Sequence, residues 1–239
     1  MSTQKAPEVS FVIPVYNEEA ILHAAVVDLR ERLAPLGWSY EVILAENGSR
    51  DGTAELARQL NARYPEVRLV QSPRPNYGHA LRLGIQQACG ELVVCEEIDL
   101  CDVDFHRHAL AILREDRADF VIGSKLLGGS KDERPPLRHA ASQLYTGVLR
   151  LLFDFRGTDT HGLKAFRRER LLPLVESCQV EGDVFASELV IRAYRSQLRV
   201  LEVPVRVLEK RPPSINLLRR VPRVLSDLTH LRRSLRSRP

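Results

Sequence analysis

The sequence predicts an α/β protein with a mainly parallel β-sheet that is covered by helices on both faces. Short apolar, β-branched segments alternate with segments of helical periodicity through the first half of the chain. The strand segments are apolar at successive positions, which is typical of strands buried on both faces. Right-handed crossovers would place the loops after the strands along one sheet edge, where open α/β sheets bind ligands.

The elements of the first half follow from these patterns. The predicted strands are the apolar runs at residues 9–15, 40–45, 67–71, 92–95 and 120–123. The predicted helices have apolar residues at helical spacing and cover residues 18–33, 53–64, 79–88 and 105–113. With 239 residues, the chain fits one large domain.

The second half begins with a polar loop rich in Gly and Pro at residues 128–136. The later predicted elements are a helix at 137–152, a strand at 163–166, a helix at 185–196, a strand at 200–208 and a helix at 217–235. The last helix has arginines between its apolar positions. This pattern favours a helix on an anionic membrane surface, with packing on the domain or on a second copy as the alternative.

Charge is divided unevenly along the chain. The 35 Lys and Arg and 31 Asp and Glu give a net charge of +4. Residues 209–239 contain nine basic and two acidic residues, or +7, which leaves 4 − 7 = −3 for residues 1–208. This asymmetry indicates an anionic partner for the tail. The tail lacks aromatic residues for base stacking, which disfavours nucleic acid.

Several classes of protein are excluded or disfavoured. No run approaches the roughly 18 apolar residues of a membrane span, and the first ten residues lack the apolar stretch of a secretory signal. We therefore expect a cytoplasmic protein. The four cysteines form no CxxC pair, which favours structural thiols in a reducing compartment over a zinc site.

Acidic and polar residues collect directly after the predicted strands. They follow the first strand at 16–19, the second at 46–53, the fourth at 96–99 and the fifth at 124–125. Carboxylates at one sheet edge suit a divalent cation with a nucleotide diphosphate, because Mg²⁺ and Mn²⁺ prefer hard oxygen ligands. For Glu19 and Asp51 we favour a helix-end or capping role.

Seven segments in order resemble the family 2 glycosyltransferases, which transfer sugars from nucleotide-sugar donors and have the GT-A fold. These segments are FVIPVYNE, ENGSRDGT, EID, FVIGSK, GTDTHGLKAFRRE, FASELVIRAYR and LEVPVRV. The glycine in Asn76–Gly78, between the second and third segments, follows the same pattern. The later ones are most similar to polyprenol-phosphate sugar transferases such as dolichol-phosphate mannose synthases. The resemblance covers about residues 8–208. It implies a single GT-A domain over residues 1–208, with a donor half at 8–125 and an acceptor half at 126–208, followed by a basic tail at 209–239.

The resemblance also implies roles for individual residues. It implies a metal, Mg²⁺ or Mn²⁺, at Glu97 and Asp99, which fill the family's DxD positions. Nucleotide-sugar contacts are expected from Pro14, Tyr16, Glu18, Glu46, Glu97 and Asp99. Phosphate or acceptor contacts are expected from Lys125, Arg138, His161, Lys164 and Arg211. The acidic candidates for catalysis are Asp99, Asp159 and Glu188.

The chain departs from the family pattern at the metal motif. Glu97-Ile98-Asp99 replaces DxD, and Glu46-Asn47 stands where two aspartates are usual. A literal DxD at residues 102–104 lies beyond the strand end, and we predict that it forms the turn and cap before the next helix. These departures keep open an alternative, a catalytically impaired nucleotide-sugar-binding or scaffold protein.

The expected reaction is an inverting, metal-assisted transfer of a hexose from GDP-mannose or a UDP-sugar. A hydroxyl acceptor needs a general base, for which Asp159 or Glu188 could serve. A lipid-phosphate acceptor needs cations instead. Glu188 has an alternative role as a surface acid paired with Arg192. A nucleotidyltransferase or a dinucleotide-dependent oxidoreductase is set aside, because no glycine-rich loop follows the first strand.

Overall fold

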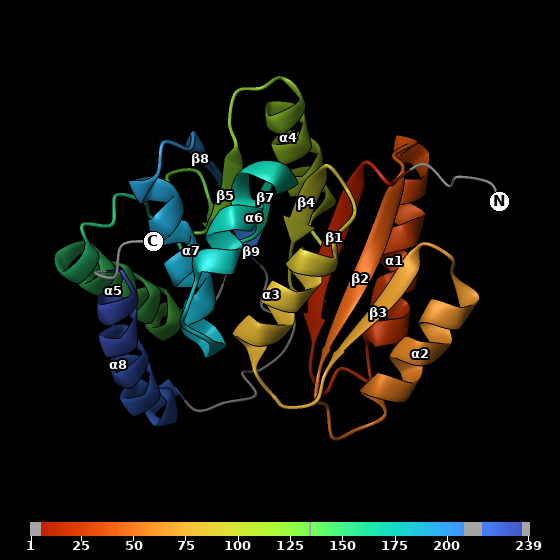
Figure 1. The fold of residues 1–239 in the computed structure, drawn as a ribbon, viewed down its shortest axis with the longest axis horizontal. Coiled ribbons are helices and arrows are strands. Elements are labelled where there is room, and N and C mark those ends of the chain that lie inside the picture. The colour runs from red at the N-terminus through yellow and green to blue at the C-terminus, as the bar shows by residue number, and fades with distance from the viewer. Residues whose placement is uncertain (1–5, 134, 208–216, 236–239) are drawn as a thin grey trace.

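Seven strands form one sheet in the order β3-β2-β1-β4-β7-β5-β8, with helices on both faces (Figure 1). The computed structural model describes residues 6–133, 135–207 and 217–235. The strands of the sheet are β1 (Val9–Val15), β2 (Tyr40–Asn47), β3 (Val67–Ser72), β4 (Leu92–Cys95), β5 (Phe120–Ser124), β7 (Lys164–Arg167) and β8 (Val200–Pro204). A separate parallel pair joins β6 (Lys131–Asp132) to β9 (Arg206–Val207).

The helices lie close to their predicted positions. They are α1 (Leu22–Leu33), α2 (Thr53–Arg63), α3 (Tyr77–Gln87), α4 (Val103–Arg114), α5 (Pro136–Phe153), α6 (Arg168–Ser177), α7 (Phe185–Arg195) and α8 (Leu217–Ser234). Two short 3₁₀ helices, η1 (Ala34–Leu36) and η2 (Gly182–Val184), complete the set. Helix α6 was not predicted, because Pro173 interrupts its sequence pattern.

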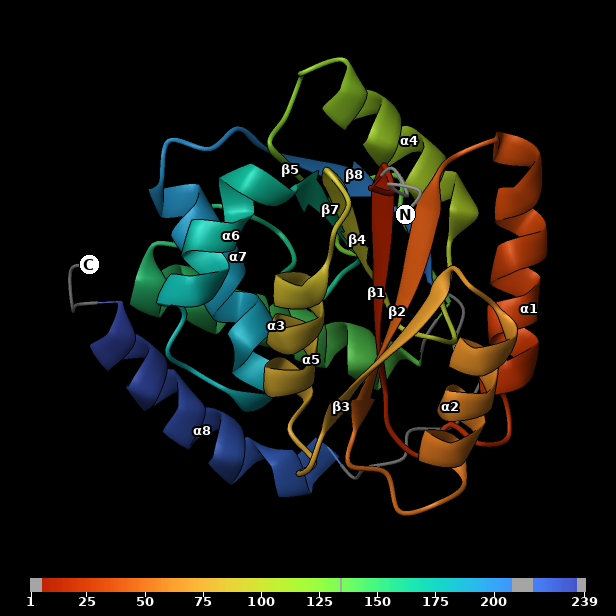
Figure 2. The ribbon, with the colours of Figure 1, turned by 45° about the vertical axis from the view of Figure 1, so that its right-hand side comes forward.

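The sheet is parallel except at β7, so the predicted α/β class is confirmed. Strand β7 pairs antiparallel with both β4 and β5. Helices α1, α2 and α4 cover one face, and α3, α6 and α7 cover the other (Figures 1 and 2). The side chains of each strand alternate between these two cores, and burial of both apolar faces stabilises the sheet.

Helix α1 begins four residues later than predicted. The backbone N–H groups of Glu18 and Glu19 donate to the side chains of Thr53 (2.7 Å) and Asp51 (3.4 Å). These hydrogen bonds hold residues 18–21 as a turn against the start of α2. Asp51 also accepts from the Thr53 backbone N–H at 3.0 Å, so its predicted structural role is confirmed.

The described part of the basic tail packs on the domain. Leu228 and Leu231 of α8 are buried in the core beside α3, α6 and α7. Ser234 donates a hydrogen bond of 2.6 Å to Glu188 of α7. These two leucines are therefore not available to a membrane surface. No helix within the described residues combines the length and apolar character needed to cross a membrane.

Candidate active site

A cleft of about 370 Å³ opens where β1, β4 and β5 end. Seven of the predicted site residues line it, namely Glu18, Glu97, Asp99, Lys125, Arg138, Asp159 and His161. They come from loops that are far apart in sequence and from the first turn of α5. The sheet brings Glu18, Glu97, Asp99 and Lys125 together because the carboxyl ends of parallel strands meet at one edge. Asp159 and His161 reach the same edge because they precede β7, which runs antiparallel to β4 and β5.

Glu97 and Asp99 form the acidic wall of this cleft. Tyr77 at the start of α3 donates its hydroxyl hydrogen to Glu97 Oε1 at 2.6 Å, which fixes that carboxylate. Burial raises the pKa of the Glu97 carboxyl, against the effect of the Tyr77 hydrogen bond, and the nearby Asp99 raises it further. Asp99 is partly exposed, and no hydrogen bond or ion pair to its side chain occurs within the described residues.

The oxygen donors on this wall fit a hard divalent cation. The hydrogen bond from Tyr77 uses Oε1 of Glu97 and leaves Oε2 for other ligands. Asp99 lines the cleft, and its carboxylate has no hydrogen bond or ion pair within the described residues. Residues 6–133, 135–207 and 217–235 contain no group of three or more His, Cys, Asp or Glu side chains placed to hold a metal. A Mg²⁺ site with one or two carboxylates and substrate phosphates needs no such group.

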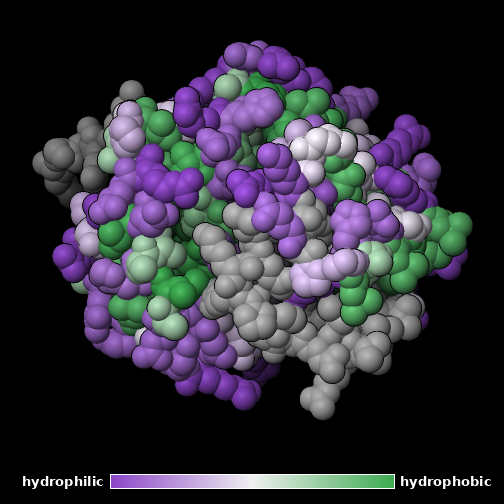
Figure 3. Space-filling model, turned by 180° about the vertical axis from the view of Figure 1, so that it is seen from behind, coloured by the Kyte–Doolittle hydropathy of each residue, from purple (hydrophilic) through white to green (hydrophobic). Residues whose placement is uncertain are grey.

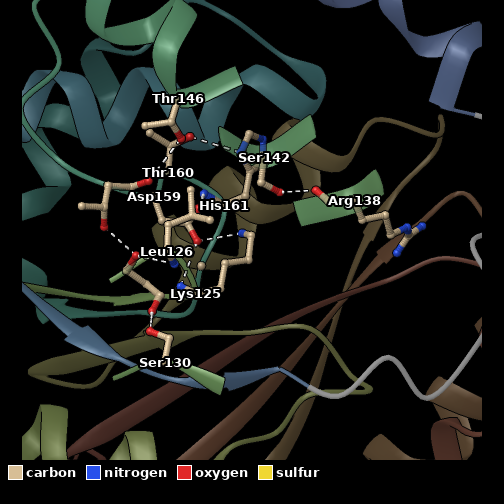
Figure 4. Close-up of polar contacts among 12 residues, drawn as sticks. Lys125, Leu126, Ser130, Arg138, Ser142, Thr146, Asp159, Thr160 and His161 are labelled. Carbon is tan, nitrogen blue, oxygen red and sulfur yellow. Dashed lines mark hydrogen bonds and ion pairs between the residues drawn. The ribbon is translucent and has the colours of Figure 1, made fainter. Parts of the chain in front are cut away.

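Lys125 and Asp159 also line this cleft and form an ion pair. Lys125 Nζ lies 2.7 Å from Asp159 Oδ2, and Figure 4 draws the two side chains pointing toward each other. Asp159 Oδ1 accepts from the His161 backbone N–H at 2.9 Å. Burial alone would raise the pKa of Asp159, but Lys125 and the His161 hydrogen bond lower it below its usual range. Asp159 is therefore held as a buried carboxylate anion.

The other predicted acceptor residues differ in how exposed they are at the cleft. His161 is exposed at the cleft, and its ring lies 5.3 Å from that of Tyr145. Arg138 is half-buried and also lines the cleft. Figure 4 draws its side chain extending away from Lys125 and Asp159. Lys164 is 4 % exposed and donates to the Gly162 carbonyl at 2.7 Å, and burial lowers its pKa. It lies below the cleft rather than on its surface.

The predicted nucleotide-contact residues Pro14, Tyr16 and Glu46 are not among the residues that line the cleft. Pro14 is buried within β1, whereas Tyr16 is 38 % exposed beyond its end. Glu46 is 3 % exposed and accepts from the Ser49 backbone N–H at 2.6 Å. Asn47 accepts from the Asn76 backbone N–H at 2.5 Å, which ties this loop to the start of α3.

Comparison with known proteins gives the family. Residues 10–172 match the family model for glycosyl transferase family 2. The chain belongs to this family. It is 31 % identical to the glycosyltransferase AglD of Haloferax volcanii over 225 residues, which cover 91 % of this chain and 36 % of that protein. It is 28 % identical to the dolichyl-phosphate beta-glucosyltransferase ALG5C of Trichomonas vaginalis over 210 residues, or 82 % of this chain and 62 % of the relative.

The fold of this glycosyltransferase also matches solved structures. Glucosyl-3-phosphoglycerate synthase of Mycobacterium tuberculosis, in complex with Mn²⁺, UDP-glucose and phosphoglyceric acid, superimposes with a TM-score of 0.67. The match has 20 % sequence identity and covers 95 % of this chain and 80 % of that one. The GT-A fold is therefore shown. The chain spans between about one third and two thirds of the two curated relatives described above.

One predicted catalytic residue of the glycosyltransferase lies away from the cleft. Glu188 is fully buried in α7, outside the residues that line the cleft, and forms an ion pair of 2.8 Å with Arg192. The predicted pairing is confirmed, but the pair is buried rather than on a helix surface. Arg211 lies outside the described residues.

Sequence reasoning missed Tyr77 and the cleft positions of Asp102 and Arg206. Asp102 was predicted as a cap, which is confirmed because it accepts from the backbone N–H groups of Asp104 and Phe105. The glycine after Tyr77 was the available signal. A Cβ at Gly78 would lie 2.4 Å from the Gly182 carbonyl oxygen, so the start of α3 packs against η2 only with glycine there.

Proposed function

We propose that this glycosyltransferase moves a hexose from a nucleotide-diphosphate sugar to the phosphate of a lipid-linked acceptor, with inversion and with Mg²⁺ or Mn²⁺. The observation that carries the proposal is that one cleft is lined both by carboxylates and by cations. Glu97 and Asp99 are its acidic wall, and we call Lys125 and Arg138 its basic wall. A metal-bound diphosphate and a second anionic group can then lie on either side of the sugar.

The acidic wall suits the donor. Glu97 and Asp99 would hold the divalent ion, which neutralises the charge that develops on the leaving diphosphate. Glu18 lines the same cleft beyond β1, beside the exposed Tyr16. We assign these two residues to the nucleoside side of the donor. The buried Glu46 positions its loop in this proposal rather than touching the base.

The basic wall suits an acceptor that is already an anion. Asp159 has a lowered pKa and an ion pair to Lys125, so it is a weak base near neutral pH. A phosphate acceptor needs no base. Its oxygen attacks the anomeric carbon, the bond from that carbon to the diphosphate oxygen breaks, and the nucleoside diphosphate leaves. Lys125, Arg138 and His161 would orient the acceptor phosphate.

Helix α5 supports a lipid-linked acceptor. Leu137, Leu144 and Leu151 recur every seven residues on one helix face and are 74 %, 71 % and 85 % exposed. The sequence of α5 contains no acidic residue, and its first turn provides Arg138 at the cleft. From behind, an apolar patch lies over the α5 side of the molecule (Figure 3). We place the lipid contact on this face, because α8 buries Leu228 and Leu231 against the domain.

The relative ALG5C, by its name, acts on dolichyl phosphate, which supports the same acceptor class. The alternative function is a nucleotide-sugar-binding protein without turnover. It is favoured by Glu97, whose longer side chain is fixed by Tyr77 where the family motif has aspartate.

One pair of measurements tests the proposal. We expect GDP- or UDP-sugars to raise the melting temperature only with Mn²⁺, and polyprenyl phosphate to be glycosylated by the donor identified in this way. Asp99→Ala should lower turnover by at least about 100-fold. Asp104→Ala, at an exposed position of the literal DxD, is the matched control and should stay within about twofold of the parent. Donor binding without turnover on any lipid phosphate would favour the binding protein.

A further inference from the structure

A buried acid–imidazole pair lies directly behind the acidic wall. Glu96 Oε2 and His106 Nε2 are 2.7 Å apart, and both side chains are completely buried. Glu96 follows the last residue of β4, and His106 lies in the first turns of α4. Neither residue lines the cleft, so the proposed reaction does not use them.

Strand alternation sends the two neighbouring glutamates to opposite faces of the sheet. Glu96 points to the α4 face, where the His106 ring lies 4.9 Å from that of Phe11. Glu97 points to the α3 face, where Tyr77 donates to it at 2.6 Å. The backbone between the two residues is therefore held from both faces, directly before Asp99.

The pair adds little to the stability of the fold that two apolar side chains of similar volume would not also add. Glu96 Oε1 and His106 Nδ1 have no hydrogen-bond partner within the described residues, so burial of both groups is only partly compensated. A buried pair of this kind is often matched or exceeded in stability by apolar residues of similar volume. The pair instead fixes an orientation, because its hydrogen bond holds the Glu96 side chain toward α4.

We propose that Glu96 and His106 are positioning residues for the metal–diphosphate site. They hold the turn that begins at Glu97, so that Glu97 and Asp99 face the cleft together. The inference rests on the proposed function, because that function assigns these two carboxylates to the metal. It predicts that metal affinity changes when the pair is removed even if the fold is as stable as before.

The test measures Mn²⁺ binding directly, by the loss of the free Mn²⁺ electron-spin-resonance signal in the presence of saturating UDP or GDP. In Glu96→Met/His106→Leu we expect the Mn²⁺ dissociation constant to rise at least about fivefold, with an unchanged or higher melting temperature. Glu96→Gln retains a hydrogen-bonding side chain toward His106 and should stay within about twofold of the parent. The control Ser10→Ala removes a buried hydrogen bond of 2.6 Å to Glu41, at the opposite end of β1.

The possible results separate the positioning role from a general loss of stability. Equal Mn²⁺ affinity in the parent and the double variant overturns the positioning role. Weaker binding in Ser10→Ala to the same degree also overturns it, because the effect would then follow general destabilisation. If the double variant does not fold, Glu96→Ala replaces it, and an affinity equal to that of Glu96→Gln overturns the inference. If the parent binds no Mn²⁺ with either nucleotide, the proposed function itself fails.

Discussion

At the scale of single residues, burial and partners decide what a carboxylate can do. Asp159 forms an ion pair with Lys125 and accepts a hydrogen bond from the His161 backbone N–H, and both interactions lower the pKa of its carboxyl. Glu97 is half-buried beside Asp99, and loss of solvent around its carboxyl raises its pKa. The first group stays an anion that binds cations weakly because Lys125 already neutralises it. The second binds a proton more readily, so a divalent ion must compete with that proton.

Asp119 gives a prediction that is independent of the proposed reaction. Arg199 donates to both of its carboxylate oxygens, at 2.9 and 3.1 Å, and this hydrogen bonding lowers the pKa of Asp119. The folded pKa is below the unfolded value, so the stabilisation is complete above about pH 4 and is lost as the pH falls through the folded pKa. Asp119→Asn should lower the free energy of unfolding by about 1 kcal/mol at pH 7, allowing for solvent screening of the half-exposed Arg199.

Urea denaturation of parent and Asp119→Asn across pH 2.5 to 7 measures this difference. We expect the two stability curves to converge at the acidic end. A gap of constant size over the whole range would show that the ion pair does not depend on Asp119 ionisation.

At the scale of elements, local sequence patterns predicted the positions of strands and helices along the chain better than they predicted which elements pair in the sheet. The strand at 92–95 and the helix at 137–152 were predicted within one residue at each end, because turns and prolines mark their limits. The antiparallel direction of β7 was not predicted, because its pairing depends on β4 and β5 and not on its own four residues.

The same distinction explains the site. Residues after strand ends were predicted to converge, and four of them, Glu18, Glu97, Asp99 and Lys125, line one cleft because the carboxyl ends of parallel strands meet there. Arg138, Asp159 and His161 join them from α5 and from the loop before β7. Glu188 was predicted as a catalytic candidate, with a helix-surface pair to Arg192 at i+4 as the alternative. Its burial follows from α8, which packs over α7 through Ser234. The sequence of α7 contains no pattern that predicts its coverage by α8.

Glu188 is expected to act on stability alone. Its carboxylate accepts from Gln179 and Val180 backbone N–H groups at 2.9 and 2.7 Å, as well as from Arg192 and Ser234. Glu188→Gln leaves the Arg192 guanidinium without its charge partner and should lower the free energy of unfolding by about 3 kcal/mol. Turnover at saturating substrates should be unchanged, with the exposed Glu176→Gln as control. Lost turnover at unchanged stability would instead make Glu188 an acceptor-side catalytic residue.

Helix α5 is expected to contact lipid through its exposed leucines. Leu144→Glu/Leu151→Glu should abolish most binding to phospholipid vesicles and raise KM for polyprenyl phosphate about tenfold or more, because charged side chains are costly in an apolar phase. Binding of the nucleotide donor should not change. Gln143→Glu is the control on the same helix, because it adds a negative charge at an exposed position that is already polar. Equal loss in both variants would assign the effect to net charge.

At the scale of the whole molecule, the net charge of +4 combines a body of −3 with a tail of +7. The described tail residues Arg232 and Arg233 are exposed although their helix packs on the domain. Basic side chains near a negative surface add attraction that salt screens, because the Debye length falls from about 10 Å at 0.1 M to about 3 Å at 1 M.

Vesicle binding should therefore have two separable components. With vesicles that contain 30 % phosphatidylglycerol, we expect co-sedimentation to fall several-fold between about 0.05 and 0.5 M NaCl. Zwitterionic vesicles should bind more weakly and with little salt dependence, through the α5 leucines alone. Salt-independent binding to both vesicle types would exclude a contribution from the basic tail.

The insertion of β7 between β4 and β5 has a consequence for synthesis of the chain. Strands β1 to β4 can pair with one another once β4 has left the ribosome, because all of their partners in this group precede its end. The outer edge of β4 then waits for β7, whose first residue is Lys164, roughly 70 residues later. At about 5–20 residues per second this edge stays unpaired for several seconds. A nascent chain stalled near residue 125 should therefore be the form most prone to edge-to-edge aggregation.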